Sequence, residues 1–177
     1  MTKQVFGFAG WSGVGKTTLI EQVIAHLAAD GVRVALIKHA HHRFDIDHPG
    51  KDSYRHREAG ATEVMISSGN RWAIMHELRG EPEMTLSEAL GRLSPCDLVL
   101  IEGYKREPLP KLEIWRSAIG KPLLFPRDEH IIALATDDPL PNDVELAVAG
   151  REPNFVRVGL ANIAAIASLA LARAATI

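Results

Sequence analysis

The chain has 177 residues, of which 46% are hydrophobic and 24% are charged, and its formal net charge is −2. This size and composition are typical of a globular protein with a substantial core, and we expect a single domain over residues 1–177. A net charge so close to zero offers no global attraction to nucleic acid or to an anionic membrane, so neither is an expected partner.

Residues 10–17, Gly-Trp-Ser-Gly-Val-Gly-Lys-Thr, complete the phosphate-binding pattern G-x-x-x-x-G-K-[ST]. An apolar run precedes them and helix-period residues follow, which is the context in which this pattern binds nucleoside triphosphates. The loop amides and the helix N-terminus would form the anion site. We expect Lys16 to reach the β- and γ-phosphates and the Thr17 hydroxyl to ligate Mg²⁺. The predicted nucleotide-binding residues of this loop are Gly10, Ser12, Gly13, Val14, Gly15, Lys16, Thr17 and Thr18.

Periodicity and turn residues predict the other elements. The alternation of strands and helices indicates an α/β fold of the P-loop NTPase type, with three layers, a mostly parallel central sheet and one antiparallel hairpin. The apolar C-terminal helix is shorter than the ~20 residues of a membrane span. We expect strands at 5–9, 32–37, 98–101, 111–115, 131–135 and 156–158, a hairpin of 62–67 with 71–77, and helices after residue 17, at 51–59, after the capping box 85–88, and at 159–172.

Residues 97–103, Asp-Leu-Val-Leu-Ile-Glu-Gly, have the form of a Walker B strand. Glu102 would emerge at the carboxyl edge of the sheet beside the phosphate loop, where it is predicted to hold Mg²⁺ or its waters. Asp97 would lie at the opposite end and is a poor candidate. The alternative is that Glu102 is an ordinary surface acid after a core strand.

The polar segment 38–48 contains several imidazoles and two carboxylates. It lacks the Cys pair and the ligand spacing of a zinc site, so solvated loop histidines are favoured over a transition-metal site. Because the loop after the second strand of such a sheet faces the nucleotide, Asp47 is predicted to reach Mg²⁺ or the attacking water, or to belong to a switch segment that orders around the γ-phosphate. Lys38 is a candidate for neutralising phosphate or substrate charge.

The chain contains no N-K-x-D guanine motif, but Asp137 follows the apolar run 131–135. Its carboxylate would accept hydrogen bonds from N1 and N2 of guanine, which favours GTP over ATP. A Thr-Asp pair after a strand is also a common turn start, and both interpretations stay open.

The single Cys96 cannot form an internal disulfide and lacks ligand spacing, which fits a reducing compartment. Residues 1–4 run straight into the first strand without the pattern of a signal peptide. We therefore expect a cytoplasmic protein.

Several local runs together resemble the MobB family, the GTP-binding adapter proteins of molybdopterin-guanine dinucleotide biosynthesis. The resemblance covers residues 4–137, and its most specific parts are the Asp-x-Pro-Gly-Lys-Asp-Ser run from Asp47 and the Glu-Gly-Tyr-Lys run from Glu102. The matching runs are 8–19, 37–39 with His42, 45–55, 57–61, 100–105 and 110–113.

This resemblance implies GTP and Mg²⁺ as cofactors, slow intrinsic hydrolysis, a homodimer, and a MobA-like guanylyltransferase as partner. Molybdopterin or its guanine dinucleotide is a further candidate ligand. Residues 13–18 would bind phosphates, Lys16, Glu102 and Asp47 would act in catalysis, and Thr17, Glu102 and Asp47 would hold the metal. Many dimeric relatives of this fold class carry an extra lysine early in the phosphate loop, where Trp11 and Ser12 stand here. Its absence agrees with slow hydrolysis.

The predicted function is that of an adapter with weak GTPase activity, because no water-orienting Gln or arginine finger is evident. Arg55, Arg57 and Arg106 are available, but basic residues on polar segments are usually only solvated. A first alternative is an ATP-dependent small-metabolite kinase or ligase that holds its acceptor with Lys38 and His39. A second is a non-enzymatic adapter that docks a partner by strand pairing along the hairpin 62–77.

Overall fold

The computed structural model describes residues 2–40, 44–151 and 153–177. The chain divides into two compact units, one of Met1–His39 with Leu86–Ile177 and one of Ala40–Thr85. Composition predicts one domain over residues 1–177, and no Pro- or Gly-rich linker marks this division in the sequence. That both units act as one nucleotide-binding domain stays a prediction.

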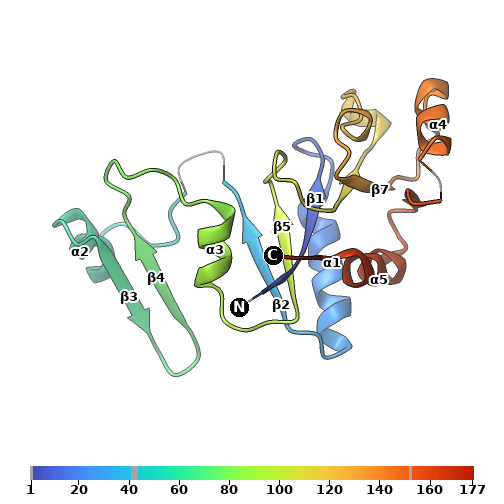
Figure 1. Cartoon of the computed structure of the whole chain (residues 1–177). Coiled ribbons are helices and arrows are strands. Elements are labelled where there is room, and N and C mark those ends of the chain that lie inside the picture. Colours follow the sequence, from blue (N-terminus) through green and yellow to red (C-terminus); the bar gives the residue numbers. More distant parts are fainter. Residues whose placement is uncertain (1, 41–43, 152) are drawn as a thin grey trace. The chain divides into compact units, whose positions relative to one another are not determined.

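The larger unit is built on a mostly parallel sheet with strand order β2-β5-β1-β6-β7-β8, to which β9 adds an antiparallel pairing with β1. Figure 1 shows β2, β5 and β1 side by side. The central strand β1 carries the phosphate loop at its carboxyl end, between β5 and β6. The mostly parallel sheet is therefore confirmed. Its strands are β1 (Gln4–Ala9), β2 (Val34–Lys38), β5 (Leu98–Glu102), β6 (Lys111–Ile114), β7 (Ile131–Ala135), β8 (Val156–Val158) and β9 (Ala175–Thr176).

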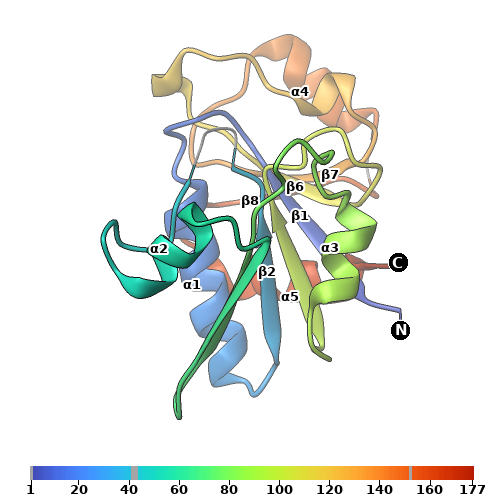
Figure 2. The ribbon, with the colours of Figure 1, turned by 90° about the vertical axis from the view of Figure 1, so that its left-hand side faces the viewer.

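Helices cover both faces of this sheet. Successive strand residues point to opposite faces, and here both sets are apolar, so each face is buried by helices. Phe6 packs with α1 (Lys16–Ala29) and α5 (Ile163–Arg173), whereas its neighbour Val5 packs with α3 (Leu86–Arg92). Figure 2 shows α1 and α3 on either side of the sheet. Further along the α3 face, α4 (Asn142–Ala149) and the short turn η2 (Phe125–Arg127) pack against β7. The predicted three-layer architecture is thus confirmed.

The smaller unit contains α2 (Asp52–Glu58) and an antiparallel hairpin of β3 (Glu63–Ser67) and β4 (Trp72–His76), as the sequence predicts. The register pairs Met65 with Ile74 and Ser67 with Trp72, so these four side chains share one face of the hairpin. Met65, Trp72 and Ile74 are exposed on that face. The opposite face includes Met75, which is buried.

Apart from small shifts at the ends of strands and the two short turns η1 (Ser117–Ile119) and η2, three elements differ from the sequence prediction. Helix α4 is missed because Pro139 and Pro141 indicate a loop, yet Pro141 is the residue that precedes the helix, a position that tolerates proline. Helix α5 begins at Ile163 because the Asn162 side chain accepts a hydrogen bond from the amide of Ala165. The short strand β9 was not predicted. Among the described residues, no helix has the length and apolar character needed to cross a membrane.

Candidate functional site

The phosphate loop adopts a backbone that only glycine accommodates well. Gly10, Gly13 and Gly15 have φ values of 143°, 82° and 96°, a region that residues with a Cβ rarely enter. A Cβ on Gly10 would also lie 2.7 Å from the carbonyl oxygen of Ile114. The glycine spacing read from the sequence is therefore explained by the curl of this loop.

The amino terminus of α1 is arranged to receive an anion. Gly15 is its N-cap, and the described residues provide neither a side-chain cap nor an acidic side chain in the first turn. The first-turn amides and the helix dipole are thus available to phosphate. Lys16 Nζ donates to the carbonyls of Gly10 (3.0 Å) and Trp11 (2.9 Å), which holds the ammonium over the loop. The side chains of Ser12, Thr17 and Thr18 lie at the surface, whereas Val14 is buried beneath the loop.

Positive charge exceeds negative charge around Lys16. Burial lowers the pKa of Lys16, Glu102 raises it, and the ammonium groups of Lys105 and Lys38 lower it further. Glu102 stands at the carboxyl end of β5, level with Phe8 and Lys38 of the neighbouring strands. Its Oε2 lies 3.8 Å from Lys38 Nζ. A phosphate group would relieve the repulsion among these three lysines.

As the sequence predicts, Glu102 and Asp97 lie at opposite ends of β5. Glu102 is only 7% exposed and lies beside the strand that carries the phosphate loop. Asp97 is bound at the other edge by Arg33, 2.7 Å from Nη2 to Oδ1, and this pairing lowers the pKa of Asp97 to about 2. Position therefore favours Glu102 as the carboxylate for Mg²⁺, a role that stays a prediction.

A cavity of about 350 Å³ opens beside the first turn of α1. Asp137, directly after β7, reaches it, and its Oδ1 accepts a hydrogen bond from the amide of Leu160 at 2.9 Å. Among the described residues, none donates a hydrogen bond to the other carboxylate oxygen of Asp137, Oδ2. This placement, next to Gly15 and Thr18, is compatible with the predicted contact to guanine.

Arg116 is a site residue that the sequence analysis missed. It lines the same cavity as Asp137, and its Nε donates to the carbonyl of Val14 in the phosphate loop at 3.2 Å. The position gives a signal in the sequence, because Arg116 directly follows the strand-like run 111–115, and ligand-binding residues of parallel sheets gather where strands end.

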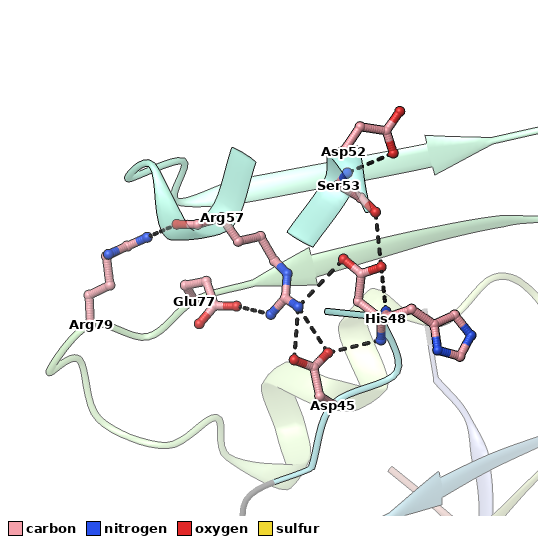
Figure 3. A network of polar contacts seen from close by, with 8 residues as sticks. Asp45, His48, Asp52, Ser53, Arg57, Glu77 and Arg79 are labelled. Atoms are coloured by element: carbon pink, nitrogen blue, oxygen red, sulfur yellow. Dashed lines mark hydrogen bonds and ion pairs between the residues drawn. The ribbon is translucent and has the colours of Figure 1, made fainter. Parts of the chain in front are cut away.

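Asp47 lies in the smaller unit, where its carboxylate already has donors. Oδ1 accepts from Ser53 Oγ and from the His48 amide, both at 2.9 Å, and Oδ2 lies 3.5 Å from Arg57 Nη2. Figure 3 shows the Arg57 guanidinium between Asp45 and Glu77, with contacts of 2.9 and 2.6 Å. These carboxylates raise the pKa of Arg57. The structure thus gives Asp47 a part in a local network, and its predicted contact with Mg²⁺ stays a prediction.

The histidine-rich segment is described only in part, since residues 41–43 lie outside the described residues. Elsewhere in the described chain, no three His, Cys, Asp or Glu side chains cluster as metal ligands.

Comparison with known proteins identifies relatives over most of the chain. The curated molybdopterin-guanine dinucleotide biosynthesis adapter protein of Escherichia coli K12 is 46% identical over 145 residues, which are 80% of this chain and 83% of that protein. The protein of the same name from Haemophilus influenzae is 43% identical over 153 residues, covering 85% of this chain and 84% of that protein.

Solved structures agree in fold. A MobB protein homologue from Bacillus stearothermophilus has a TM-score of 0.66 at 23% identity, covering 96% of this chain and 99% of that chain. Bacillus subtilis MobB has a TM-score of 0.69 at 19% identity, with 97% and 98% covered. The family model described as MobB, molybdopterin guanine dinucleotide synthesis protein B, matches residues 5–137. The chain therefore belongs to the MobB family.

Proposed function

We propose that this protein is a GTP- and Mg²⁺-binding adapter of molybdopterin-guanine dinucleotide biosynthesis that acts with a MobA-like guanylyltransferase and hydrolyses GTP slowly. The observation that carries the proposal is the phosphate loop, with its left-handed glycines and the surplus of lysines around it. The names of the E. coli and H. influenzae relatives support the adapter role.

The phosphate loop provides most of what phosphoryl transfer needs, which is positioning and neutralisation of charge. Its amides and Lys16 would hold the β- and γ-phosphates, and Thr17 with Glu102 would hold Mg²⁺, which supplies further positive charge when bound. The described residues place Arg116 beside the loop, but its Nε is engaged with the Val14 carbonyl. We therefore expect turnover below ~1 s⁻¹ for the isolated protein, under the low end of kinase rates.

Asp137 supports guanine over adenine. A carboxylate accepts two hydrogen bonds from N1–H and N2–H of guanine, whereas adenine presents an acceptor at N1 and no amino group at C2. A site built for such a pair rejects an analogue that lacks the donors, because its own polar atoms are left unpaired. Losing charged hydrogen bonds of this kind costs about 1.5–3 kcal/mol, or ten- to a hundredfold in affinity.

The test is equilibrium binding of fluorescent GTP with Mg²⁺, competed by ATP and GDP, on the wild type and two variants. Lys16→Ala is expected to weaken all three nucleotides at least tenfold. Asp137→Asn is expected to abolish the preference for GTP while the affinity for ATP changes little. The asparagine keeps an oxygen for the Leu160 amide, so the loop itself is preserved.

Each outcome has a distinct meaning. Equal competition by ATP on the wild type would overturn the guanine role of Asp137 and favour an ATP-dependent kinase or ligase, which would consume ATP only when a specific metabolite is added. Unchanged binding by Lys16→Ala would overturn nucleotide binding at this loop altogether.

A further inference from the structure

The last residues of β6, β7 and β8 form a row across the sheet. Ile114 pairs with Ala135, and Ala135 pairs with Val158. All three side chains belong to the core on the face that α1 covers. Because side chains alternate between the two faces of a sheet, a residue two places further along points to that face too if the backbone stays extended. Arg116 meets this condition, with φ −136° and ψ 129°.

The next row consists of Arg116, Asp137 and Leu160, and all three line the cavity beside the first turn of α1. Asp137 lies in the middle, because β7 is the strand between β6 and β8. Neighbouring strands are about 4.8 Å apart, so Arg116 and Leu160 start roughly 10 Å apart on either side of the carboxylate. A flat ring with contacts of about 3.5–4.0 Å on each face needs about 7–8 Å. The row therefore has room for one ring between its outer members.

Hydrogen bonds between the three strand ends fix the walls of this cavity. Asp137 Oδ1 accepts from the Leu160 amide at 2.9 Å, which joins the ends of β7 and β8. Asp138 Oδ2 accepts from the Ser117 amide at 2.6 Å, which joins the ends of β6 and β7. A Cβ on Gly159 would lie 3.1 Å from Asp137 Oδ1, so the glycine allows this close approach. The walls are thus preorganised before a ligand enters.

Arg116 is attached to the phosphate loop by one of its three guanidinium nitrogens. Its Nε donates to the carbonyl of Val14 at 3.2 Å. Among the described residues, none accepts a hydrogen bond from Nη1 or Nη2, and the residue is exposed. The Nε bond restrains the side chain at the wall of the cavity, while the plane of the guanidinium stays accessible to a ligand. Guanidinium groups stack on aromatic rings because they are planar, delocalised and weakly hydrated.

We propose that Arg116 covers one face of the base of the bound nucleotide, with the turn at Leu160 and Ala161 against the other face and the Asp137 carboxylate at the edge of the ring. The inference rests on the proposed function and adds a contact to the base that the phosphate loop does not supply. Stacking requires an aromatic face but no particular edge. Arg116 therefore holds guanine and adenine alike, whereas Asp137 distinguishes between them.

The test is isothermal titration calorimetry of GTP and of inorganic tripolyphosphate, each with Mg²⁺. Arg116→Ala is expected to weaken GTP about tenfold and to change tripolyphosphate less than about twofold, because tripolyphosphate has no base. Arg116→Lys, which keeps the charge without the planar group, should lose part of the affinity for GTP. Lys16→Ala should weaken both ligands. Arg92→Ala, which removes an exposed cation from the end of α3, should bind both as the wild type does.

The outcomes separate this inference from the proposed function. Equal losses of GTP and tripolyphosphate in Arg116→Ala would overturn the stacking role, because Arg116 would then act on the phosphate loop through Val14. Unchanged GTP affinity in Arg116→Ala would overturn it and leave the proposed GTP site intact. A wild type that binds neither GTP nor ATP would overturn both proposals. If the wild type binds ATP as tightly as GTP, the guanine role of Asp137 fails, but a tenfold loss of ATP affinity in Arg116→Ala would still support stacking.

Discussion

Lys111 and Glu113 carry charge into the interior of the larger unit. Their exposed fractions are 2% and 0%, and they alternate along β6 with Leu112 and Ile114, which pack on the α1 face. A strand with this pattern usually turns its charged residues to solvent. Here the loops that follow β5 and β6 cover them, so both side chains bind backbone atoms.

Burial makes Glu113 a pH-dependent element of stability. Burial raises its pKa from 4.5 to about 7, although the amides of Leu124 and Phe125 act in the opposite direction. Between pH 4.5 and about 7, Glu113 therefore keeps its proton in the folded protein but has lost it in the unfolded chain. The free energy of unfolding should fall as the pH rises from about 4.5 to about 7, by roughly 3 kcal/mol at most. Urea unfolding at a series of pH values measures this fall.

Glu113→Gln isolates the effect from other titrating groups. The amide keeps an oxygen for the Leu124 and Phe125 amides but does not ionise in this range. The variant should lose this part of the pH dependence and be more stable than the wild type at pH 8. Glu129→Gln, at an exposed neighbouring acid, should leave the dependence unchanged. If the free energy of unfolding depends on pH equally in the wild type and in Glu113→Gln, the pKa of Glu113 does not differ between the folded and unfolded states, and the prediction is wrong.

At the scale of single elements, the hairpin β3–β4 presents an unusual surface. Met65, Trp72 and Ile74 are 63%, 61% and 43% exposed and share one face. Each strand pairs only with the other in the described sheet, which leaves two free edges. We predict that this exposed apolar face is an interaction site.

We predict that Met65→Ser combined with Trp72→Ser weakens binding of a MobA-like guanylyltransferase at least tenfold. Aromatic residues at the centre of an interface commonly contribute 2 kcal/mol or more. Because both side chains are exposed, the free energy of unfolding should change by less than about 1 kcal/mol. Surface plasmon resonance with the immobilised partner measures the affinity. Leu146→Ser, at an isolated exposed leucine of α4, is the matched control, and an unchanged affinity of the hairpin variant would exclude this face as the docking site.

The elements that the sequence predicts well are those whose periodicity and turn residues agree. The phosphate loop, the hairpin and the acid at the end of β5 are of this kind. Helix α4 is missed because flanking prolines mask a short amphipathic segment, and β9 is missed because two residues carry no period. The strand end before Arg116 is visible in the sequence, but its contact with Val14, 102 residues away, is not. The burial of Lys111 and Glu113 depends on how the loops on either side of β6 fold over the strand, which a local pattern does not contain.

At the scale of the whole molecule, the chain divides into a unit that carries the predicted nucleotide-binding residues and a unit that carries the Arg57 network and the hairpin. The predicted site residues divide in the same way, since Asp47 is the one assigned to the smaller unit. Their functions can therefore be tested separately by a method that reports on each unit.

Nucleotide binding should stabilise the larger unit by mass action. When the GTP concentration, with Mg²⁺ present, is a hundred times the dissociation constant, binding raises the free energy of unfolding by about 2.7 kcal/mol. Hydrogen exchange followed by mass spectrometry should show slower exchange in α1, β1 and β5, and Lys16→Ala should abolish the change. Exchange that stays the same in these elements would contradict nucleotide binding by this unit.

The peptides over residues 44–59 decide the role of Asp47, because protection there by GTP but not by GDP would support its predicted place in a switch segment. Protection confined to the larger unit would instead leave Asp47 a structural partner of Ser53 and Arg57.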